Sequence, residues 1–248
     1  HEWSQALALF EDLRKQLWEP NIVVYGAAIS ACQRGHRWES ALGLLAQIRQ
    51  SCLQPNAVAC SAAISACGRC GEWAQALLLF ADAFRLRFAN VVVYNAAVMA
   101  VGNASKWEFV LSLLDAMQVG NAQPDLFTCS AAIKAFEGEQ GWPFALELLW
   151  SMPEQQLAAN VVVFSSAITS CRQGAQWPEA IWLLDAMRLQ ALVPDVIAHN
   201  AAISACEQGQ QWQTALGLLE ALCLSRQKPN LITFNAMLSA CSRGSEWQ

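Results

Sequence analysis

A tryptophan recurs along the whole chain at a nearly constant interval, and this period constrains the fold more than any other feature. The repeated positions are Trp3, Trp38, Trp73, Trp107, Trp142, Trp177, Trp212 and Trp247, 35 residues apart except for one step of 34. Such a fixed period over 248 residues is typical of an array of stacked units rather than of a compact enzyme. We therefore expect a single array over 1–248, with full units 22–56, 57–90, 91–125, 126–160, 161–195 and 196–230 and partial units 1–21 and 231–248.

Each unit is predicted to contain two helices. Asn or Asp stands eighteen residues after six of the first seven tryptophans and seventeen after Trp73, often behind proline, and these side chains are good helix N-caps. A first helix then runs to a turn that holds Gly35, Gly174, Gly209 or Gly244, where glycine suits the end of a helix. A second helix starts near each tryptophan, where apolar residues recur at helical spacing. The residue missing from the 34-residue unit is expected in the loop 83–90.

One helical hairpin cannot bury its own apolar face, but stacked neighbours can. The predicted fold is therefore all-α, a right-handed superhelical α-solenoid of stacked helix-turn-helix hairpins. The repeated tryptophans are expected to be core residues, and Trp107→Ala is expected to cost the ~3–5 kcal/mol typical of a buried aromatic. Cysteines at multiples of the same period are expected to be small buried residues; they are Cys32, Cys67, Cys171, Cys206 and Cys241.

Composition excludes several other classes of protein. With 55% hydrophobic and 14% charged residues, the chain is not intrinsically disordered. Two charge-free stretches, 88–105 and 155–171, reach spanning length, but both contain internal Asn or Gln, so no membrane helix is predicted. A lone C-x-x-C (Cys67 and Cys70) and three histidines do not suffice for a zinc site, and no cofactor is predicted. We find no catalytic motif and predict that the chain is not an enzyme.

The junction between units carries a family resemblance. Segments such as NVVVYNAAVMA (90–100) and NVVVFSSAITS (160–170), followed by a glycine turn and W-x-x-A-L-x-L-L, resemble the pentatricopeptide repeat family over essentially the whole chain. The tetratricopeptide repeat is the alternative, but it normally has 34 residues and a different opening. The resemblance implies sequence-specific binding of single-stranded RNA, one nucleotide per repeat, in RNA processing, stability or translation. It also implies a mitochondrial or plastid location; the sequence opens at His1 and holds no targeting segment, which we interpret as a fragment.

The resemblance further implies which positions contact RNA, counted from the residue that follows each capping Asn or Asp. The base is read by the fifth residue, namely Gly26, Ser61, Asn95, Ser130, Ser165, Asn200 or Asn235. It is also read by the last residue, namely Asn56, Asn90, Asp125, Asn160, Asp195 or Asn230. The second residue sandwiches the base between repeats and is always apolar, namely Val23, Val58, Val92, Phe127, Val162, Ile197 or Ile232.

The chemistry of these side chains predicts a base sequence. An Asp carboxylate accepts from the central N–H of uracil or guanine, whereas an Asn amide donates to the ring nitrogen of adenine or cytosine. The resemblance assigns Ser to purines and Asn to pyrimidines at the fifth position and places the amino-terminal repeat at the 5′ end of the RNA. Units two to six then predict 5′-AUAGC-3′, while Gly26 with Asn56 favours adenine only weakly and Asn235 a pyrimidine. Two alternatives stay open: the last residue acts only as a helix cap, and the second residue is ordinary core. The short second unit also leaves open whether Asn90 is displaced.

The resemblance also implies phosphate contacts at the thirteenth residue, where a basic side chain occurs at Arg34, Arg69 and Arg243. The first helices carry five basic residues against Glu137, Glu139 and Glu207, although the whole chain has a net charge of −5. Phosphate neutralisation supplies much of the affinity for nucleic acid, so we expect weaker binding than in a strongly basic array. The alternative function is a protein–protein interaction solenoid without RNA binding. A neutral or positive inner groove would favour RNA, and an acidic groove would favour a protein partner.

Overall fold

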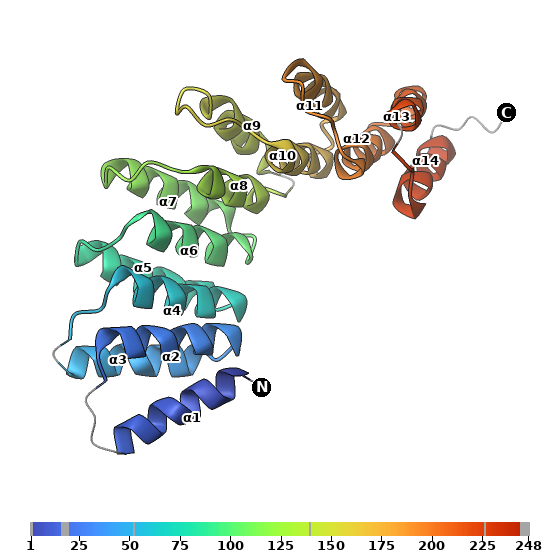
Figure 1. Ribbon diagram of the computed structural model, residues 1–248. Helices are drawn as coiled ribbons and strands as arrows, with labels where there is room; N and C mark the ends of the chain where they lie inside the picture. The colour runs from blue at the N-terminus through green and yellow to red at the C-terminus, as the bar shows by residue number, and fades with distance from the viewer. Residues whose placement is uncertain (1, 16–19, 52, 139, 226, 244–248) are drawn as a thin grey trace. The chain divides into compact units, whose positions relative to one another are not determined.

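The computed structural model describes residues 2–15, 20–51, 53–138, 140–225 and 227–243, and every regular element within these ranges is an α-helix (Figure 1). The first helices of the units are α2 (Ile22–Arg34), α4 (Ala57–Arg69), α6 (Val91–Gly102), α8 (Leu126–Ala135), α10 (Val161–Gln173), α12 (Val196–Gln208) and α14 (Leu231–Arg243). The second helices are α1 (Glu2–Lys15), α3 (Trp38–Gln50), α5 (Trp73–Arg85), α7 (Trp107–Val119), α9 (Trp142–Ser151), α11 (Trp177–Leu189) and α13 (Trp212–Leu224). Gly244, Trp247 and Glu139 lie outside the described residues.

The helices begin where the sequence predicts. Each first helix starts directly after its Asn or Asp, and the side-chain oxygen accepts from backbone N–H groups of the first turn, as Asn21 does from Val23 and Val24 at 3.1 and 3.0 Å. These bonds satisfy donors that have no partner inside the helix. Every second helix from α3 to α13 starts at its tryptophan. The all-α fold of stacked hairpins is thereby confirmed.

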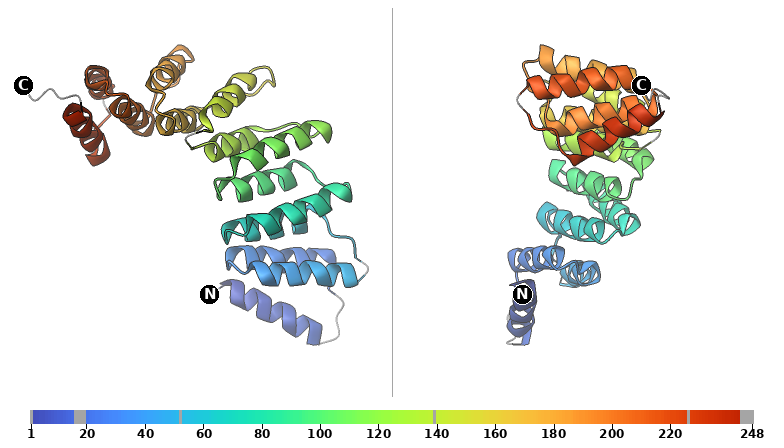
Figure 2. Two further views of the ribbon diagram at one scale, coloured as in Figure 1. Left: turned by 180° about the vertical axis from the view of Figure 1, so that it is seen from behind. Right: turned by 90° about the vertical axis from the view of Figure 1, so that its right-hand side faces the viewer.

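The chain forms two compact units, His1–Ala131 and Ala132–Gln248. In the first unit, α4 packs between α2 and α6, and each of these helices also packs against the second helix of its own hairpin and that of the preceding one (Figure 2). In the second unit, α12 packs in the same way between α10 and α14. Each of these inner first helices is therefore covered by two second helices. One continuous array over 1–248 stays a prediction of the repeat spacing.

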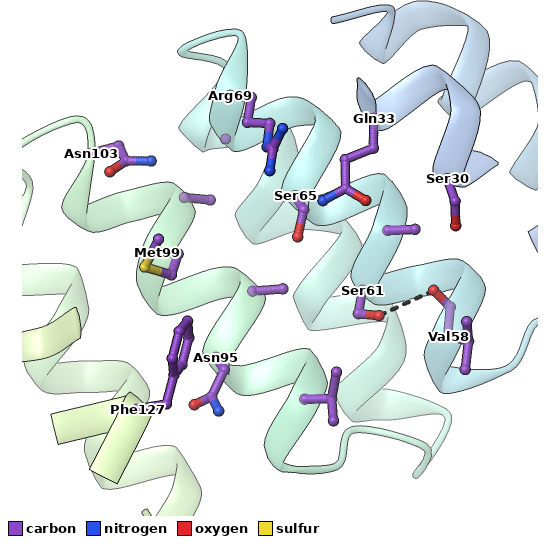
Figure 3. A pocket seen from close by; sticks show the side chains of 15 residues that line it. Ser30, Gln33, Val58, Ser61, Ser65, Arg69, Asn95, Met99, Asn103 and Phe127 are labelled. Atoms are coloured by element: carbon purple, nitrogen blue, oxygen red, sulfur yellow. Dashed lines mark hydrogen bonds between the residues drawn. The ribbon is translucent and has the colours of Figure 1, made fainter. Parts of the chain in front are cut away.

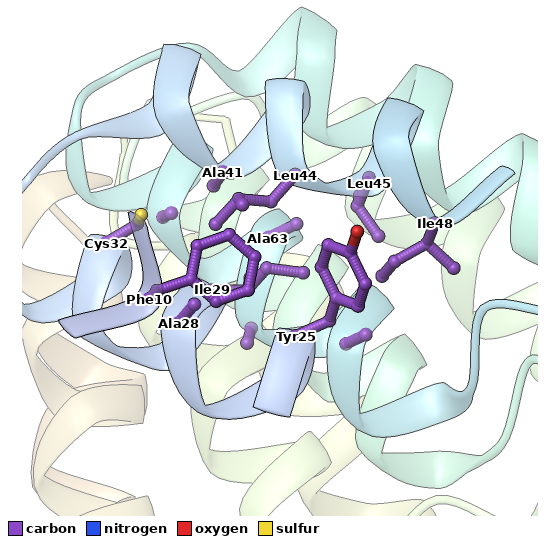
Figure 4. Close-up of a cluster of buried hydrophobic side chains, with 13 residues drawn as sticks. Phe10, Tyr25, Ala28, Ile29, Cys32, Ala41, Leu44, Leu45, Ile48 and Ala63 are labelled. Atoms are coloured by element: carbon purple, nitrogen blue, oxygen red, sulfur yellow. The ribbon is translucent and has the colours of Figure 1, made fainter. Parts of the chain in front are cut away.

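The core of each hairpin stack is built from aliphatic and aromatic side chains of both helix layers. In the first unit Phe10 from α1 contacts Tyr25 from α2 edge-on, with ring centroids 5.2 Å apart, and both rings pack with Ile29 and Ile48 (Figure 4). The repeated cysteines Cys32, Cys67, Cys171 and Cys206 are fully buried as free thiols, whereas Cys241 is half-buried. Burial raises the pKa of Cys171 to about 12, so this thiol stays protonated at neutral pH.

The tryptophans differ from the prediction. Each described repeat tryptophan, Trp107 included, is half-buried. In the second helices from α3 to α13 the fully buried residue of that turn lies three positions further along, as with Ala180 after Trp177. The reason is that the tryptophan stands at the start of the second helix, where its indole packs on the turn of the following unit, as Trp177 packs on Gly209. The cost expected for a fully buried aromatic is therefore too high for Trp107.

The turn glycines also have another role than predicted. Gly174 and Gly209 have φ near −80°, and the left-handed residue is the one that follows, Ala175 or Gln210, with φ of 54° and 57°. The glycine is required by space, because a Cβ at Gly209 would lie 2.2 Å from Cδ1 of Trp177. A Cβ at Gly174 would likewise lie 2.3 Å from Cδ1 of Trp142, and a Cβ at Gly35 would lie 2.6 Å from Cδ2 of Trp3. In these three units the turn glycine thus leaves space for the tryptophan of the preceding unit.

The second unit is one residue short in the loop where the sequence predicts the deletion. Residues 86–90 connect α5 to α6, whereas residues 120–125 connect α7 to α8, so the loop is shorter by one and the helices keep their length. Asn90 still caps α6 through Val93, which places it in register with the other caps. None of the described helices combines the length and apolarity needed to cross a bilayer.

Candidate nucleic-acid interface

The second residues of the units form a set of exposed apolar side chains. Their exposed fractions range from 55% at Phe127 to 71% at Val23, and Val58, Val92, Val162, Ile197 and Ile232 lie between these values. The alternative that they are ordinary core is therefore wrong. Exposing an apolar side chain in every unit at the same place is unfavourable in water, and clustered exposed apolar groups commonly mark a binding surface.

The fifth residues lie one helical turn further on and are more buried. Asn95 and Asn200 are 9% and 8% exposed, and Ser165 is 7% exposed. Gly26 has nothing within 4 Å of the place where a Cβ would stand, so its unit leaves open space there. Ser61 and Ser130 are half-buried, and Asn235 in α14 is exposed.

Fifth and last residues meet in pairs in both compact units. Nδ2 of Asn95 donates to the carboxylate of Asp125 at 3.3 Å, and Nδ2 of Asn200 donates to Oδ1 of Asn230 at 3.2 Å. Oγ of Ser165 lies 3.2 Å from Oδ1 of Asp195. In the second repeat Ser61 instead donates to the carbonyl oxygen of Val58, 3.0 Å away, and has no described bond to Asn90. In these three units, residues thirty positions apart are therefore brought together.

Capping fixes which atom of each last residue remains available. A backbone N–H can be accepted only by oxygen, so the amides of Asn56, Asn90, Asn160 and Asn230 commit Oδ1 to the helix, at 2.8 to 3.1 Å. No bond from their NH₂ groups to another described residue occurs, so these groups remain as donors. Asp195 commits one oxygen to Ala198 at 2.8 Å and keeps the second as an acceptor. Capping and base reading are therefore compatible roles of one side chain.

The carboxylate of Asp125 is held in its ionised form. Burial alone would raise its pKa, but hydrogen bonds from the backbone N–H groups of Thr128 and Phe127 and from the amide of Asn95 outweigh burial, and the net effect lowers the pKa. At neutral pH this side chain can therefore act only as an acceptor.

A groove of about 480 Å³ runs along the exposed face of the first unit (Figure 3). Its walls include the second, fifth, ninth and thirteenth residues of successive first helices, such as Val58, Asn95 and Phe127, together with small residues between them. These positions share one face of a helix because they are separated by three or four residues. Arg69 is the single charged residue among the described residues that line this groove.

Comparison with known proteins identifies the repeat. The family model of the pentatricopeptide repeat domain matches residues 8–70 and 182–243, together just over half of the chain, and a family model of the single repeat matches residues 58–86. The chain belongs to the pentatricopeptide repeat family. No curated protein sequence matches it.

Two solved pentatricopeptide repeat structures share the fold. The repeat protein PPR10 from maize superposes with a TM-score of 0.69 at 27% identity, covering 95% of this chain and 34% of the maize chain. This chain therefore spans about a third of that protein. The repeat domain of the Arabidopsis thaliana protein-only RNase P 1, solved in complex with tRNA, superposes with a TM-score of 0.62 at 14% identity. That match covers 72% of this chain and 95% of the Arabidopsis domain.

The arginines predicted at the thirteenth position of these pentatricopeptide repeats are exposed but differ in their surroundings. Arg69 lines the groove of the first unit together with Asn103. Arg243 forms an ion pair with Glu207, its guanidinium nitrogen 3.7 Å from the carboxylate. Arg34 is exposed at the end of α2. The positive charge available to a ligand is therefore small.

Sequence reasoning missed two sets of residues at this face. The ninth residues Ser30, Ser65 and Met99 line the groove, and their spacing of four from the fifth residues is the signal that could have found them. Thr128 and Thr233, the third residues of their units, bond directly to the fifth residues of the preceding units. Their signal is a hydroxyl at a position that is apolar in the other units.

Proposed function

We propose that the protein binds single-stranded RNA in a sequence-specific manner, one nucleotide per repeat, with the preferred core 5′-AUAGC-3′. The observation that carries this proposal is the contact between fifth and last residues beside an exposed apolar second residue, repeated in both compact units. Membership of the family supports it, and the Arabidopsis repeat domain with the same fold binds tRNA. The proposed role is in RNA processing, stability or translation in mitochondria or plastids.

Each last residue reads the base through the side-chain atom that does not cap the following helix. The second carboxylate oxygen of Asp195 accepts an N–H from guanine, as that of Asp125 does from uracil, while the free NH₂ groups of Asn90, Asn160 and Asn230 donate to the ring nitrogen of adenine or cytosine. The exposed second residues of neighbouring repeats, such as Val58 and Val92, enclose the flat faces of the base. Specificity then rests on desolvated hydrogen bonds rather than on charge.

The charge of the groove favours RNA over the alternative of a protein-binding solenoid. The lining described in the first unit contains Arg69 and no carboxylate, although the whole chain carries an acidic excess. With at most three arginines at phosphates, binding should depend only moderately on salt. For single strands the slope of log affinity against log salt is about −0.7 per phosphate, so we expect a slope no steeper than about −2.

Fluorescence anisotropy tests this proposal. A labelled unstructured RNA that contains 5′-AUAGC-3′ is compared with the reversed core 5′-CGAUA-3′ in the same flanks, and with DNA of the first sequence. We expect the first RNA to bind at least tenfold more tightly than the reversed core. Equal affinity for both cores would contradict sequence-specific binding, and no RNA binding at all would favour the protein-binding alternative.

A further inference from the structure

The third residue of each unit is apolar except in two units. Thr128 and Thr233 are both fully buried, whereas the corresponding residues elsewhere are Val24, Ala59, Val93, Val163 and Ala198. Burying a hydroxyl is unfavourable unless it is hydrogen-bonded. The two threonines therefore require hydrogen-bond partners, which the apolar third residues of the other units do not need.

Both threonines make the same set of hydrogen bonds. Oγ1 of Thr128 accepts from the backbone N–H of Asp125 at 3.2 Å and lies 2.5 Å from Oδ1 of Asn95. Oγ1 of Thr233 accepts from the backbone N–H of Asn230 at 3.1 Å and lies 2.6 Å from Oδ1 of Asn200. The same arrangement thus occurs once in each compact unit.

These bonds fix the orientation of an amide. Oγ1 of Thr128 also lies 2.8 Å from Oδ1 of Asp125, but that oxygen already accepts from the backbone N–H of Thr128 and from Asn95. We therefore assign the single hydroxyl proton of Thr128 to the nearer acceptor, Oδ1 of Asn95. With its oxygen bonded to Thr128, Asn95 directs its NH₂ toward Asp125. Rotating the amide by half a turn would place its oxygen against that carboxylate. One N–H of the Asn95 amide donates to Asp125, and the second N–H remains to donate to a carbonyl oxygen of the base.

The pairing of residue types follows the same logic along the chain. Threonine occurs only after a unit whose fifth residue is Asn, in the pairs Asn95 with Thr128 and Asn200 with Thr233. Where the fifth residue is Gly or Ser, the next third residue is apolar, in the pairs Gly26 with Ala59, Ser61 with Val93, Ser130 with Val163 and Ser165 with Ala198. A serine hydroxyl rotates freely and needs no such partner; Ser165 lies 2.8 Å from the carbonyl oxygen of Val161.

We propose that Thr128 and Thr233 are positioning residues that determine specificity, each holding the amide of Asn95 or Asn200 in the orientation that selects a pyrimidine. The inference rests on the proposed RNA binding and extends the reading of a base from two side chains to three. The third member belongs to the following repeat, so the preference of one repeat depends on its neighbour.

Thr128→Val tests this role, because it removes the hydroxyl and keeps the shape of the side chain. Anisotropy is measured with RNAs that carry U or G at the nucleotide read by Asn95 and Asp125. The parent is expected to prefer U, and Thr128→Val should lower the U-to-G affinity ratio about fivefold, the effect of one lost hydrogen bond. Thr128→Ser restores a hydroxyl and should restore the ratio. Melting temperatures of the same samples separate a change in specificity from a loss of folding.

Val93→Thr is the matched control, since it adds a hydroxyl after Ser61, and it should leave the preference of that repeat unchanged. In the Ser61→Asn background, however, adding Val93→Thr should raise the C-to-A ratio about fivefold above that of Ser61→Asn alone. This gain does not depend on the folding of Thr128→Val. A parent that binds U and G equally would overturn base reading itself. A parent that discriminates, with an unchanged ratio in Thr128→Val and no gain from Val93→Thr, would overturn the positioning role alone.

Discussion

Replacing Gly209 by Ala tests the packing of a tryptophan on the turn of the next repeat. The backbone of Gly209, with φ −80° and ψ 3°, is accessible to alanine, so the change introduces no backbone strain. The new Cβ would lie 2.2 Å from Cδ1 and 2.9 Å from Cγ of Trp177, much closer than van der Waals contact. Overpacking of this kind costs ~1–3 kcal/mol. For a chain of this length, each kcal/mol corresponds to a fall in melting temperature of about 2–4 °C.

Gly217→Ala is the matched control in the same repeat. Gly217 lies inside α13 with nothing within 4 Å of the position that a Cβ would occupy, so alanine should stabilise the helix by ~0.5–1 kcal/mol. The two glycine-to-alanine changes are therefore expected to have opposite signs in urea unfolding monitored by circular dichroism.

A double-mutant cycle identifies the partner. In the Trp177→Ala background the Cβ of residue 209 meets no indole, so Gly209→Ala should cost less than ~0.5 kcal/mol. A Gly209→Ala variant as stable as Gly217→Ala would refute the reasoning. So would a cost that is unchanged when Trp177 is removed.

Two further predictions concern the interface and its surroundings. Phe127 is 55% exposed, so Phe127→Ala should change the unfolding free energy by less than ~1 kcal/mol, but it should weaken RNA binding by ~1–3 kcal/mol, as measured by anisotropy on the same preparation. Burial lowers the pKa of His199 below its usual 6.5, so the neutral ring stabilises the fold above pH 6.5, and this contribution is lost as the pH falls through the folded-state pKa. His199→Phe, which installs the ring found at Phe164, should reduce the loss of unfolding free energy below pH 6.5; a parallel pH profile would contradict this.

The sequence sufficed to predict the elements of the fold. Helix starts could be located because capping and helical periodicity are local properties, and α6 begins directly after Asn90 even though the preceding unit is one residue short. The packing of Trp177 on Gly209 could not be predicted, because it depends on how closely one repeat approaches the next. Sequence alone therefore assigns the turn glycine to backbone conformation, whereas the structure assigns it to space.

The candidate interface was predicted less completely. The resemblance supplied the second, fifth and last positions, but only the structure distinguishes an exposed Val162 from a core valine. Contact between residues 95 and 125 requires the end of one repeat to return beside its first helix, which a linear sequence does not display. Thr128 was missed because threonine and valine have nearly the same shape, and the pattern of apolar residues does not reveal a buried hydroxyl.

Exchanging the carboxylate of Asp195 for an amide tests base reading most directly. Asp195→Asn keeps a side-chain oxygen to cap α12 through Ala198, so its melting temperature should stay close to that of the parent. Affinities are measured for RNAs that carry G or A at the nucleotide read by Ser165 and residue 195. We expect the parent to prefer G and Asp195→Asn to prefer A, with discrimination shifted by ~1–2 kcal/mol. Equal binding of both RNAs by both proteins would contradict base reading, and a loss of all RNA binding together with a fall in melting temperature would show that Asp195 acts mainly as a helix cap.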